Sequence, residues 1–457
     1  RTMKLNTTIL LLLGSSFCLF GSCLAGVESL PLELMAKLKS PEQEKGVEID
    51  MGLMKLPPVV EDEILSEHRT AVEESLMDSR ASVCSVTIRK DTANPQPVFL
   101  QTNSEEFYPY SAEGVMQVET GKTFQMWCPS EFTSIKGKLL TASCVSGTIF
   151  RVDGTSYDFK EFVCKSWPAY VAQKTGATCN GGIMVRVGFE ISTSRFAKQM
   201  EICFDEDEEV TRYVHHTLDP GSNYYQTGVD RLTFQTGGFF GGKNVDKLYT
   251  QNSQIDTINN ELGGVGAQYF DPKSSVFLAR GHMAAKADFV YGFEQRATFL
   301  FVNVAPQWQV FNAGNWARVE DGVRAWVSKN NLHVNCYTGV WGVTTLPNKN
   351  GVETPLYLTI DANNNGLIPV PMLYFRVVID PSTQRGIVFI GVNNPHLTLK
   401  QIEQNYILCP DVSDQVTYVN WKKTDIRTGY SYACRVEDFV QHVSHLPKLT
   451  ASGGLLI

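Results

Sequence analysis

The sequence predicts an α+β protein in which an antiparallel sheet follows a disulfide-rich β lobe. Between residues 81 and about 210, short β-type runs (84–88, 123–127, 147–152 and 182–191) alternate with Gly, Ser and Asn turns, and six cysteines fall in this stretch. After residue 210, we expect strands of one sheet at 276–279, 297–304, 335–345 and 370–379, and a further strand at 387–394. Helical patterns run from about Asn312 to Lys329, over 399–406 and over 436–445. The hydrophobic content of 43% over 457 residues suffices for one large domain or two average ones.

Residues 3–25 have the features of a secretory signal peptide. Lys4 supplies positive charge, residues 9–13 form an apolar run, and Cys23-Leu24-Ala25 ends the segment with small residues suited to cleavage. A membrane anchor is the alternative, which the short run broken by Gly14 disfavours. No later stretch is long and apolar enough to span a bilayer, so we expect a secreted protein without membrane contact.

Residues 26–80 lack cysteine and are rich in Glu and Leu, and residues 61–77 can form an amphipathic helix. We predict an acidic pro-segment that ends near Arg80; the alternative is an N-terminal helix that is retained. An acidic pro-segment could occupy a basic nucleic-acid groove. The further boundaries that we predict are a cysteine-rich β lobe at 81–210, an α+β domain at 211–449 and a flexible tail at 450–457.

Cysteine usage predicts disulfides. Two of the 11 cysteines lie in the predicted signal peptide. In a secreted protein the others are expected to pair, with one left over because their number is odd. They are Cys84, Cys128, Cys144, Cys164, Cys179, Cys203, Cys336, Cys409 and Cys434. Their spacing does not match a zinc module, and it leaves the pairing open.

Charge and several tempting patterns limit the functions that the sequence supports. The formal net charge of −8 disfavours a nucleic-acid binder unless positive potential is concentrated locally. Adjacent His215 and His216 diverge on a strand, so we predict structural roles. Residues 231–242 form a predicted strand and glycine turn without phosphate-loop spacing. Residues 361–366 begin like a calcium loop but lack its final Glu, and the acidic run at 205–209 is typical of a solvated loop.

Residues 280–324 contain the residue types that phosphodiester hydrolysis requires. His282 can be neutral near pH 7 and accept a proton from water. The Asn312 amide oxygen suits Mg²⁺, which prefers oxygen ligands and keeps most of its waters, so one protein ligand can suffice. Such a metal polarises the phosphate and stabilises the leaving oxygen. Arg280 and Arg324 are permanent cations that suit phosphate oxygens.

Spacing along the predicted helix supports this hypothesis. Asn312, Trp316, Glu320 and Arg324 are each four residues apart and are expected to share one face, with Trp316 as the packing anchor. Asn312 lies at the predicted N-terminal end, where the helix dipole also favours phosphate. Each residue has a simpler interpretation: His282 as a structural histidine, Asn312 as a helix N-cap, and Glu320 with Arg324 as a surface pair. Their order along the chain is far more specific.

The pattern Arg-Gly-His, Asn-x-x-x-Gln and Asn-x-x-x-Trp-x-x-x-Glu-x-x-x-Arg resembles the DNA/RNA non-specific endonucleases of the ββα-metal, His-Me finger class. The whole chain resembles the secreted arthropod branch, which includes duplex-specific nucleases and double-stranded RNases. The resemblance covers roughly residues 210–440. It implies a ββα-metal nuclease core on the antiparallel sheet and hydrolysis of DNA and RNA to 5′-phosphate ends. The implied cofactor is Mg²⁺, with Mn²⁺ as a substitute.

The resemblance also implies residue roles. His282 matches the general base and Asn312 the metal-binding Asn. Asn303, Gln307 and Glu320 match residues that line or support the site, and we assign substrate binding to Asn303 and Gln307. Arg280 and Arg324 match the arginines on the phosphate side, and with Glu320 we count them as catalytic.

Two departures from the family pattern affect rate and substrate preference. Many members have Asp where Ala279 stands, and bacterial members carry an upstream arginine that residues 267–270 do not supply. Lys273 or Arg296 are candidate substitutes for that arginine. Two alternatives to a sugar-non-specific nuclease therefore stay open. One is a nuclease that prefers double-stranded substrates, such as double-stranded RNA, and the other is a catalytically inactive nucleic-acid-binding protein.

Overall fold

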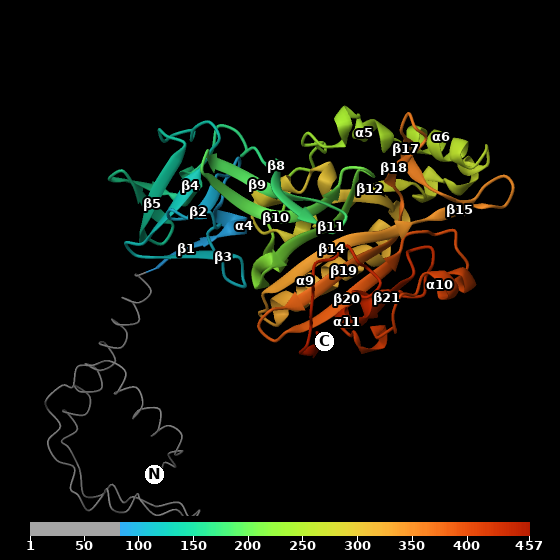
Figure 1. Cartoon of the computed structure of the whole chain (residues 1–457). Helices are drawn as coiled ribbons and strands as arrows, with labels where there is room; N and C mark the ends of the chain where they lie inside the picture. Colours follow the sequence, from blue (N-terminus) through green and yellow to red (C-terminus); the bar gives the residue numbers. More distant parts are fainter. Residues whose placement is uncertain (1–82) are drawn as a thin grey trace, which may run out of the picture. The chain divides into compact units, whose positions relative to one another are not determined.

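The computed structural model describes residues 83–457, which lie in one compact unit. The predicted signal peptide, the pro-segment and the helix at 61–77 lie outside the described residues. Sheet dominates this part of the chain, and helices and short hairpins surround it (Figure 1). None of the helices in residues 83–457 is long and apolar enough to cross a membrane.

The N-terminal lobe, which we define as residues 83–164, contains two small antiparallel sheets. Strands β2, β4, β5, β6 and β7 are neighbours in that order, and β1 pairs with β3. The strands are β1 (Val83–Thr87), β2 (Val98–Gln101), β3 (Val115–Glu119), β4 (Thr123–Trp127), β5 (Leu139–Ser146), β6 (Ile149–Val152) and β7 (Thr155–Asp158). Two disulfides, Cys84–Cys144 and Cys128–Cys164, cross-link the lobe. A one-turn helix, α4 (Ile88–Asp91), follows β1.

A nine-stranded sheet spans the rest of the described chain. Its order is β21-β20-β19-β14-β11-β10-β9-β8, and β22 adds to β20 as a parallel strand. The strands are β8 (Val171–Cys179), β9 (Gly182–Ser192), β10 (Arg195–Asp205), β11 (Val210–Leu218), β14 (Val334–Val343), β19 (Pro371–Asp380), β20 (Arg385–Val392), β21 (Ser431–Cys434) and β22 (Gly454–Leu455). Strands on both sides of residue 210 therefore belong to one sheet. Residues 450–457, expected as a flexible tail, contain β22.

Disulfides pair the cysteines that the composition led us to expect. Cys179–Cys203 joins β8 to β10, and Cys409–Cys434 ties the segment before β21 to that strand. With the two bonds of the N-terminal lobe, all six cysteines between residues 81 and 210 are paired among themselves. Among the cysteines of residues 83–457, Cys336 of β14 is the odd one and is a buried free thiol.

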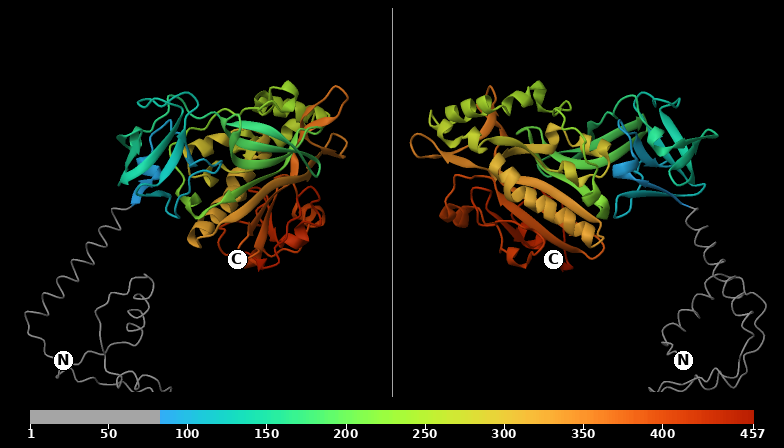
Figure 2. Two further views of the ribbon diagram at one scale, coloured as in Figure 1. Left: turned by 60° about the vertical axis from the view of Figure 1, so that its left-hand side comes forward. Right: turned by 180° about the vertical axis from the view of Figure 1, so that it is seen from behind.

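Alternation along β19 distributes its side chains between the two faces of the sheet. Leu373, Phe375 and Val377 face a core that includes residues of α10 (Leu399–Asn405) and α11 (Val436–Phe439). Val378 faces the opposite core, which α9 (Ala317–Lys329) covers. Helix α9 lies along the strands of the large sheet (Figure 2, right). Valines at i, i+4 and i+8 of α9 form its buried stripe. Arg376 shares this face and is fully buried.

A two-stranded pair leads into this helix. Strands β12 (Leu278–His282) and β13 (Val304–Trp308) are antiparallel, with His282 opposite Val304. The chain then continues through α8 (Gln309–Phe311) and a π-helical turn over Asn312–Trp316 into α9. Gly314 has φ −94° and ψ −121°, and an added Cβ would lie 2.6 Å from the carbonyl oxygen of Thr428. Only glycine lets the 428 loop approach so closely.

Several element predictions are confirmed and others are wrong. Strands β1, β4, β6 and β9 confirm four predicted β runs, β14 and β19 pair in one sheet as expected, and β20 confirms the strand predicted at 387–394. The predicted membership of the β12 segment in that sheet is wrong, because β12 and β13 form a separate two-stranded pair. The strand predicted at 297–304 is wrong: α7 (Gly292–Ala297) ends there, a 3₁₀ turn follows, and the strand is β13. A short buried apolar run does not distinguish strand from helix. The segment 231–242 contains no strand, and the helix predicted at 436–445 ends at Phe439.

The remaining elements are not strands of the large sheet, but they contribute buried residues, such as Ile258 and Leu358, to the same hydrophobic cluster as Val187 of β9. They are α5 (Val245–Leu248), α6 (Gln251–Glu261), β15 (Thr345–Pro347), β16 (Glu353–Pro355), β17 (Tyr357–Ile360) and β18 (Gly366–Pro369). Residues 361–366 form the turn between β17 and β18, as predicted, in which the Asp361 side chain accepts hydrogen bonds from nearby backbone N–H groups.

Candidate active site

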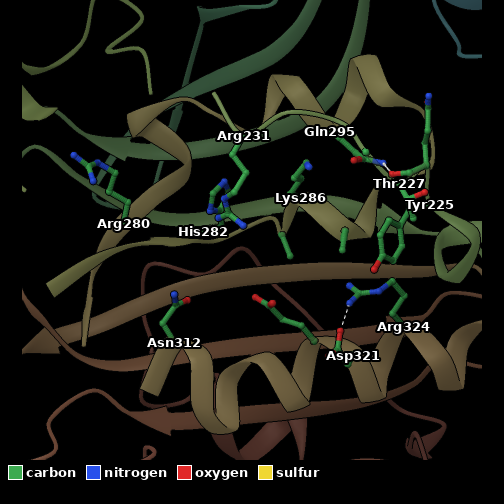
Figure 3. A pocket seen from close by; sticks show the side chains of 15 residues that line it. Tyr225, Thr227, Arg231, Arg280, His282, Lys286, Gln295, Asn312, Asp321 and Arg324 are labelled. Atoms are coloured by element: carbon green, nitrogen blue, oxygen red, sulfur yellow. Dashed lines mark hydrogen bonds and ion pairs between the residues drawn. The ribbon is translucent and has the colours of Figure 1, made fainter. Parts of the chain in front are cut away.

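A polar cavity of about 440 Å³ lies between the β12 segment and the α9 helix. Its lining includes Tyr225, Gln226, Thr227, Gly228, Arg231, Arg280, His282, Ala285, Lys286, Ala287, Gln295, Asn312, Glu320, Asp321 and Arg324. Five residues predicted from the sequence therefore meet in one cavity, and Asn303 and Gln307 do not line it. In Figure 3, Asn312 and Asp321 rise from the helix, and His282, Arg231 and Lys286 occupy the opposite wall.

His282 ends β12 and has an aromatic environment. Its ring centroid lies 5.1 Å from that of Phe234 and 5.3 Å from that of Phe299. Burial first, and then the positive charges of Arg231 and Lys286, together lower the pKa of His282 to about 3. Its Nε2 is buried and has no hydrogen-bond partner among the described residues. His282 is therefore neutral at pH 7 and has a ring nitrogen available to accept a proton.

Asn303 and Gln307 are buried and pack against β12 and the turn that follows it. The Asn303 side chain accepts a hydrogen bond from Ala284 N at 2.9 Å and donates to Ala284 O at 3.0 Å, which fixes the turn after His282. Gln307 on β13 is fully buried, and a Cβ added to Gly281 would lie 2.3 Å from its Oε1. Glycine before His282 is thus required by close packing. Substrate contact by Asn303 and Gln307 stays a prediction, since the structure buries both away from the cavity.

Two side chains on the helix offer oxygen atoms to the cavity. Asn312 donates from Nδ2 to Gln309 Oε1 at 3.1 Å, and its Oδ1 has no protein partner in residues 83–457. Glu320 makes no hydrogen bond to another described residue. Burial first, and then the negative charge of Asp288, raise the pKa of Glu320 to about 7. Near neutral pH this carboxyl group is divided between its protonated and ionised forms.

Both arginines predicted from the sequence are paired with carboxylates. Arg324 donates from Nη1 to Asp288 Oδ1 at 2.6 Å and from Nη2 to Asp321. Arg280 donates from Nη2 to Asp246 Oδ1 at 2.6 Å. Their charges are largely compensated within the protein, so neither guanidinium is the strongest cation available to a substrate.

Two cations that sequence reasoning missed line the wall beside His282. Arg231 has no ion-pair or hydrogen-bond partner among the described residues, although it lines the cavity. Lys286 donates from Nζ to the backbone oxygen of Val229 at 2.5 Å. The substitutes considered from the sequence do not reach the cavity: Lys273 is exposed in a 3₁₀ turn, and Arg296 stacks over Trp167 at 4.4 Å.

Next to Arg324, on the cavity lining, lies a buried cluster of charged side chains around Asp288. Its carboxylate accepts from Arg376 Nη2 at 2.9 Å and from Arg324 Nη1 at 2.6 Å, and it lies 3.0 Å from His216 Nε2. Burial alone would raise the pKa of Asp288, but the two arginines and His216 outweigh it and hold the pKa well below its usual range. Adjacent His215 points to the other face of β11, where it stacks on Tyr337, so each histidine has its own structural environment.

The donor set of the cavity is compatible with a hard divalent cation. Within residues 83–457, no group of three or more His, Cys, Asp or Glu side chains is arranged to hold a metal ion. Mg²⁺, however, keeps several of its waters and can be held by one or two protein oxygens together with substrate phosphate. The unpartnered Asn312 Oδ1 and the Glu320 carboxylate are oxygens of this kind.

Comparisons with known proteins point in the same direction. The profile of the family described as DNA/RNA non-specific endonuclease matches residues 180–439. A salivary endonuclease of Lutzomyia longipalpis is 29% identical over 366 residues, covering 78% of this chain and 83% of the relative. Salivary protein Tsal2A of Glossina morsitans morsitans is 22% identical over 369 residues, covering 75% and 90%.

A solved EndoG/EndoGI complex also matches this chain. Its TM-score is 0.33 and the sequence identity is 18%, covering 56% of this chain and 84% of that one. We draw nothing further from a structural similarity this low. Every residue that lines the cavity falls within the stretch 180–439 matched by the family profile.

Proposed function

This chain belongs to the DNA/RNA non-specific endonuclease family, and on that premise we propose that it hydrolyses phosphodiester bonds of DNA and RNA with Mg²⁺, leaving 5′-phosphate ends. One observation carries the proposal: His282, Asn312 and Arg231, a cation with no partner among residues 83–457, line a single cavity. Had the imidazole and the amide pointed into separate regions, no such chemistry could take place. Mn²⁺ is the expected substitute metal.

The residues of this chain divide the work of the reaction. A substrate phosphate binds against Arg231 and Lys286, and its negative charge offsets the two cations that lower the pKa of His282. The pKa of His282 therefore rises toward the working pH when substrate is bound, which suits a general base. Neutral His282 then takes the proton from the attacking water.

Asn312 Oδ1 and the Glu320 carboxylate would hold the metal at the helix wall, where it supplies positive charge for the phosphate oxygens. Glu320, whose pKa is about 7, can exchange a proton at the same wall. The ββα-metal assignment of β12, β13 and the following helix belongs to this proposal, and the order of these elements supports it.

We also propose that the protein is secreted. Two relatives that share most of its length carry the word salivary in their names. Four disulfides in residues 83–457 fit an oxidising compartment. The signal-like composition of residues 3–25 agrees with this destination.

The deciding experiment replaces His282 by alanine and digests matched single- and double-stranded DNA and RNA. Cleavage should fall by a factor of roughly 10² or more while binding is retained. His442→Ala, on an exposed histidine, is the matched control. Equal cleavage by His282→Ala and wild type would reject the base assignment. Comparing the four substrates tests the duplex-preferring alternative, and wild-type binding without cleavage would favour the inactive alternative.

A further inference from the structure

The cationic wall of the cavity is made by a segment without regular secondary structure. Residues 225–231 contain neither helix nor strand, yet Tyr225, Thr227, Gly228 and Arg231 from this segment line the cavity. Such a segment cannot rely on a backbone ladder for its position. Its geometry therefore depends on contacts from neighbouring parts of the molecule.

The N-terminal lobe supplies the central contacts. Gln96, which is fully buried, donates from Nε2 to Gln226 Oε1 at 2.6 Å. Its own Oε1 accepts from Phe293 N at 3.3 Å, so one side chain connects the segment to α7. Asn94 Oδ1 accepts from Gln226 Nε2 at 3.3 Å. Both polar atoms of the Gln96 side chain thus have partners outside the lobe, in Gln226 and Phe293.

A second hydrogen bond to the segment comes from the same lobe, and two more come from residues outside the lobe. Arg89 donates from Nε to the backbone oxygen of Tyr225 at 2.7 Å. From the other side, Gln295 donates to the backbone oxygen of Gln226 at 2.9 Å, and Lys286 donates to Val229 O. The segment is therefore fastened at Tyr225, Gln226 and Val229, directly before Arg231.

We propose that the N-terminal lobe is a working part of the active site: it holds residues 225–231 so that Arg231 stays beside His282, and Gln96 is the positioning residue. This inference rests on the proposed function, since it assigns the lobe a role in the same reaction. Gln96 touches no substrate and acts through Gln226. Removing its amide takes away one of the two hydrogen bonds that Gln226 Oε1 accepts, leaves the backbone N–H of Phe293 without its side-chain acceptor, and loosens the segment.

The experiment compares Gln96→Leu with Gln125→Leu in the full chain. Gln125 is a buried glutamine of the same lobe that bonds Arg195 Nη1 at 2.7 Å and does not touch the segment. Gln96→Leu should lower kcat on a short oligonucleotide roughly 10- to 100-fold, because small displacements of positioned groups are costly. It should also speed hydrogen exchange at residues 225–231. Gln125→Leu should do neither.

The pH dependence of kcat/KM provides a second measurement, which a general loss of structure would not shift. Arg231 and Lys286 are the charged groups that lower the pKa of His282, so moving Arg231 away raises that pKa. The acid limb of kcat/KM should therefore shift to higher pH in Gln96→Leu alone. The inference would be overturned if both glutamine variants lost kcat equally while the acid limb of kcat/KM and the hydrogen exchange of residues 225–231 stayed as in wild type.

Failure of the proposed function is recognised separately, by a wild type that does not cleave. In that case hydrogen exchange still decides whether Gln96 holds the segment. If Gln96→Leu does not fold, Arg89→Gln tests the same idea on an exposed side chain, with neighbouring Lys90→Gln as its control. A smaller loss of kcat and a shifted limb are expected for Arg89→Gln alone, and identical behaviour of the two variants would contradict the inference.

Discussion

Replacing Arg231 by methionine tests the site most directly, because this guanidinium lines the cavity without a partner among the described residues. In the free protein no ion pair or hydrogen bond to another described residue depends on its charge, so folding stability near neutral pH should be unchanged. With substrate bound, the variant loses a hydrogen bond to a charged group, which contributes about 1.5–3 kcal/mol. Since 1.36 kcal/mol corresponds to tenfold, kcat/KM should fall roughly 10- to 150-fold.

The same substitution changes the pH dependence with a definite sign. Burial and then Arg231 and Lys286 lower the pKa of His282 to about 3. The base must be neutral to act, so activity is lost as pH falls through this pKa. Without Arg231 the pKa rises, and the acid limb of kcat/KM moves to higher pH.

The assay is cleavage of a quenched fluorescent oligonucleotide from about pH 3, where His282 titrates, to about two pH units above neutrality, so that the acid limb lies inside the measured range. Arg427→Met, on an exposed arginine outside the cavity, is the matched control and should match wild type throughout. If Arg231→Met keeps kcat/KM within about twofold of wild type and its acid limb stays in place, the reasoning about this wall is refuted.

Three further changes probe the other groups of the site. Asn312→Ala should need more Mg²⁺ for the same rate in a metal titration, and an unaltered metal dependence would remove Asn312 from the site. Burial raises the pKa of Glu320 to about 7, so its contribution to stability is present at low pH and is lost as pH rises from about 4.3 toward 7. Glu320→Gln should therefore raise the free energy of unfolding at pH 8 in metal-free buffer, measured by urea denaturation, and lower activity. Arg376→Met should cost about 3–5 kcal/mol of unfolding free energy by breaking the buried pair with Asp288, and a cost near zero would contradict this assignment. Because the pKa of Asp288 is depressed, that stabilisation is present above its unfolded value of about 3.9 and is lost as pH falls below it.

Motif order proved informative for the part of the site carried by consecutive elements. His282 at the end of a strand and Asn312, Glu320 and Arg324 along a helix were predicted from spacing, and the structure brings them to one cavity. Sequence reasoning missed Arg231, because it lies in an irregular segment far upstream. No local pattern marks a residue whose position depends on distant contacts.

For the fold, too, some features could be predicted from the sequence and others could not. Short β-type runs bounded by clear turn residues, such as β4 and β9, were predicted closely, because strand-forming composition and flanking turn residues agree. The apolar stretch 297–304 was assigned to the wrong element, since burial on all sides erases the period. Both predicted arginines of the site, Arg280 and Arg324, were expected to face phosphate, and their carboxylate partners could not be identified before the chain was folded.

The π-helical turn at Asn312–Trp316 changes which side chains share a face of the helix. In a regular α-helix, with about 100° per residue, Asn312 and Glu320 would be rotated by about 80° from each other. Here Gly314 lies outside the helical region, with φ −94° and ψ −121°, so the backbone does not step by a regular angle between these residues: Asn312 and Glu320 both line the cavity, whereas Trp316 is buried in the core. Deleting a single residue from this turn would keep the helix and all its side chains, yet would swing the amide away from the carboxylate.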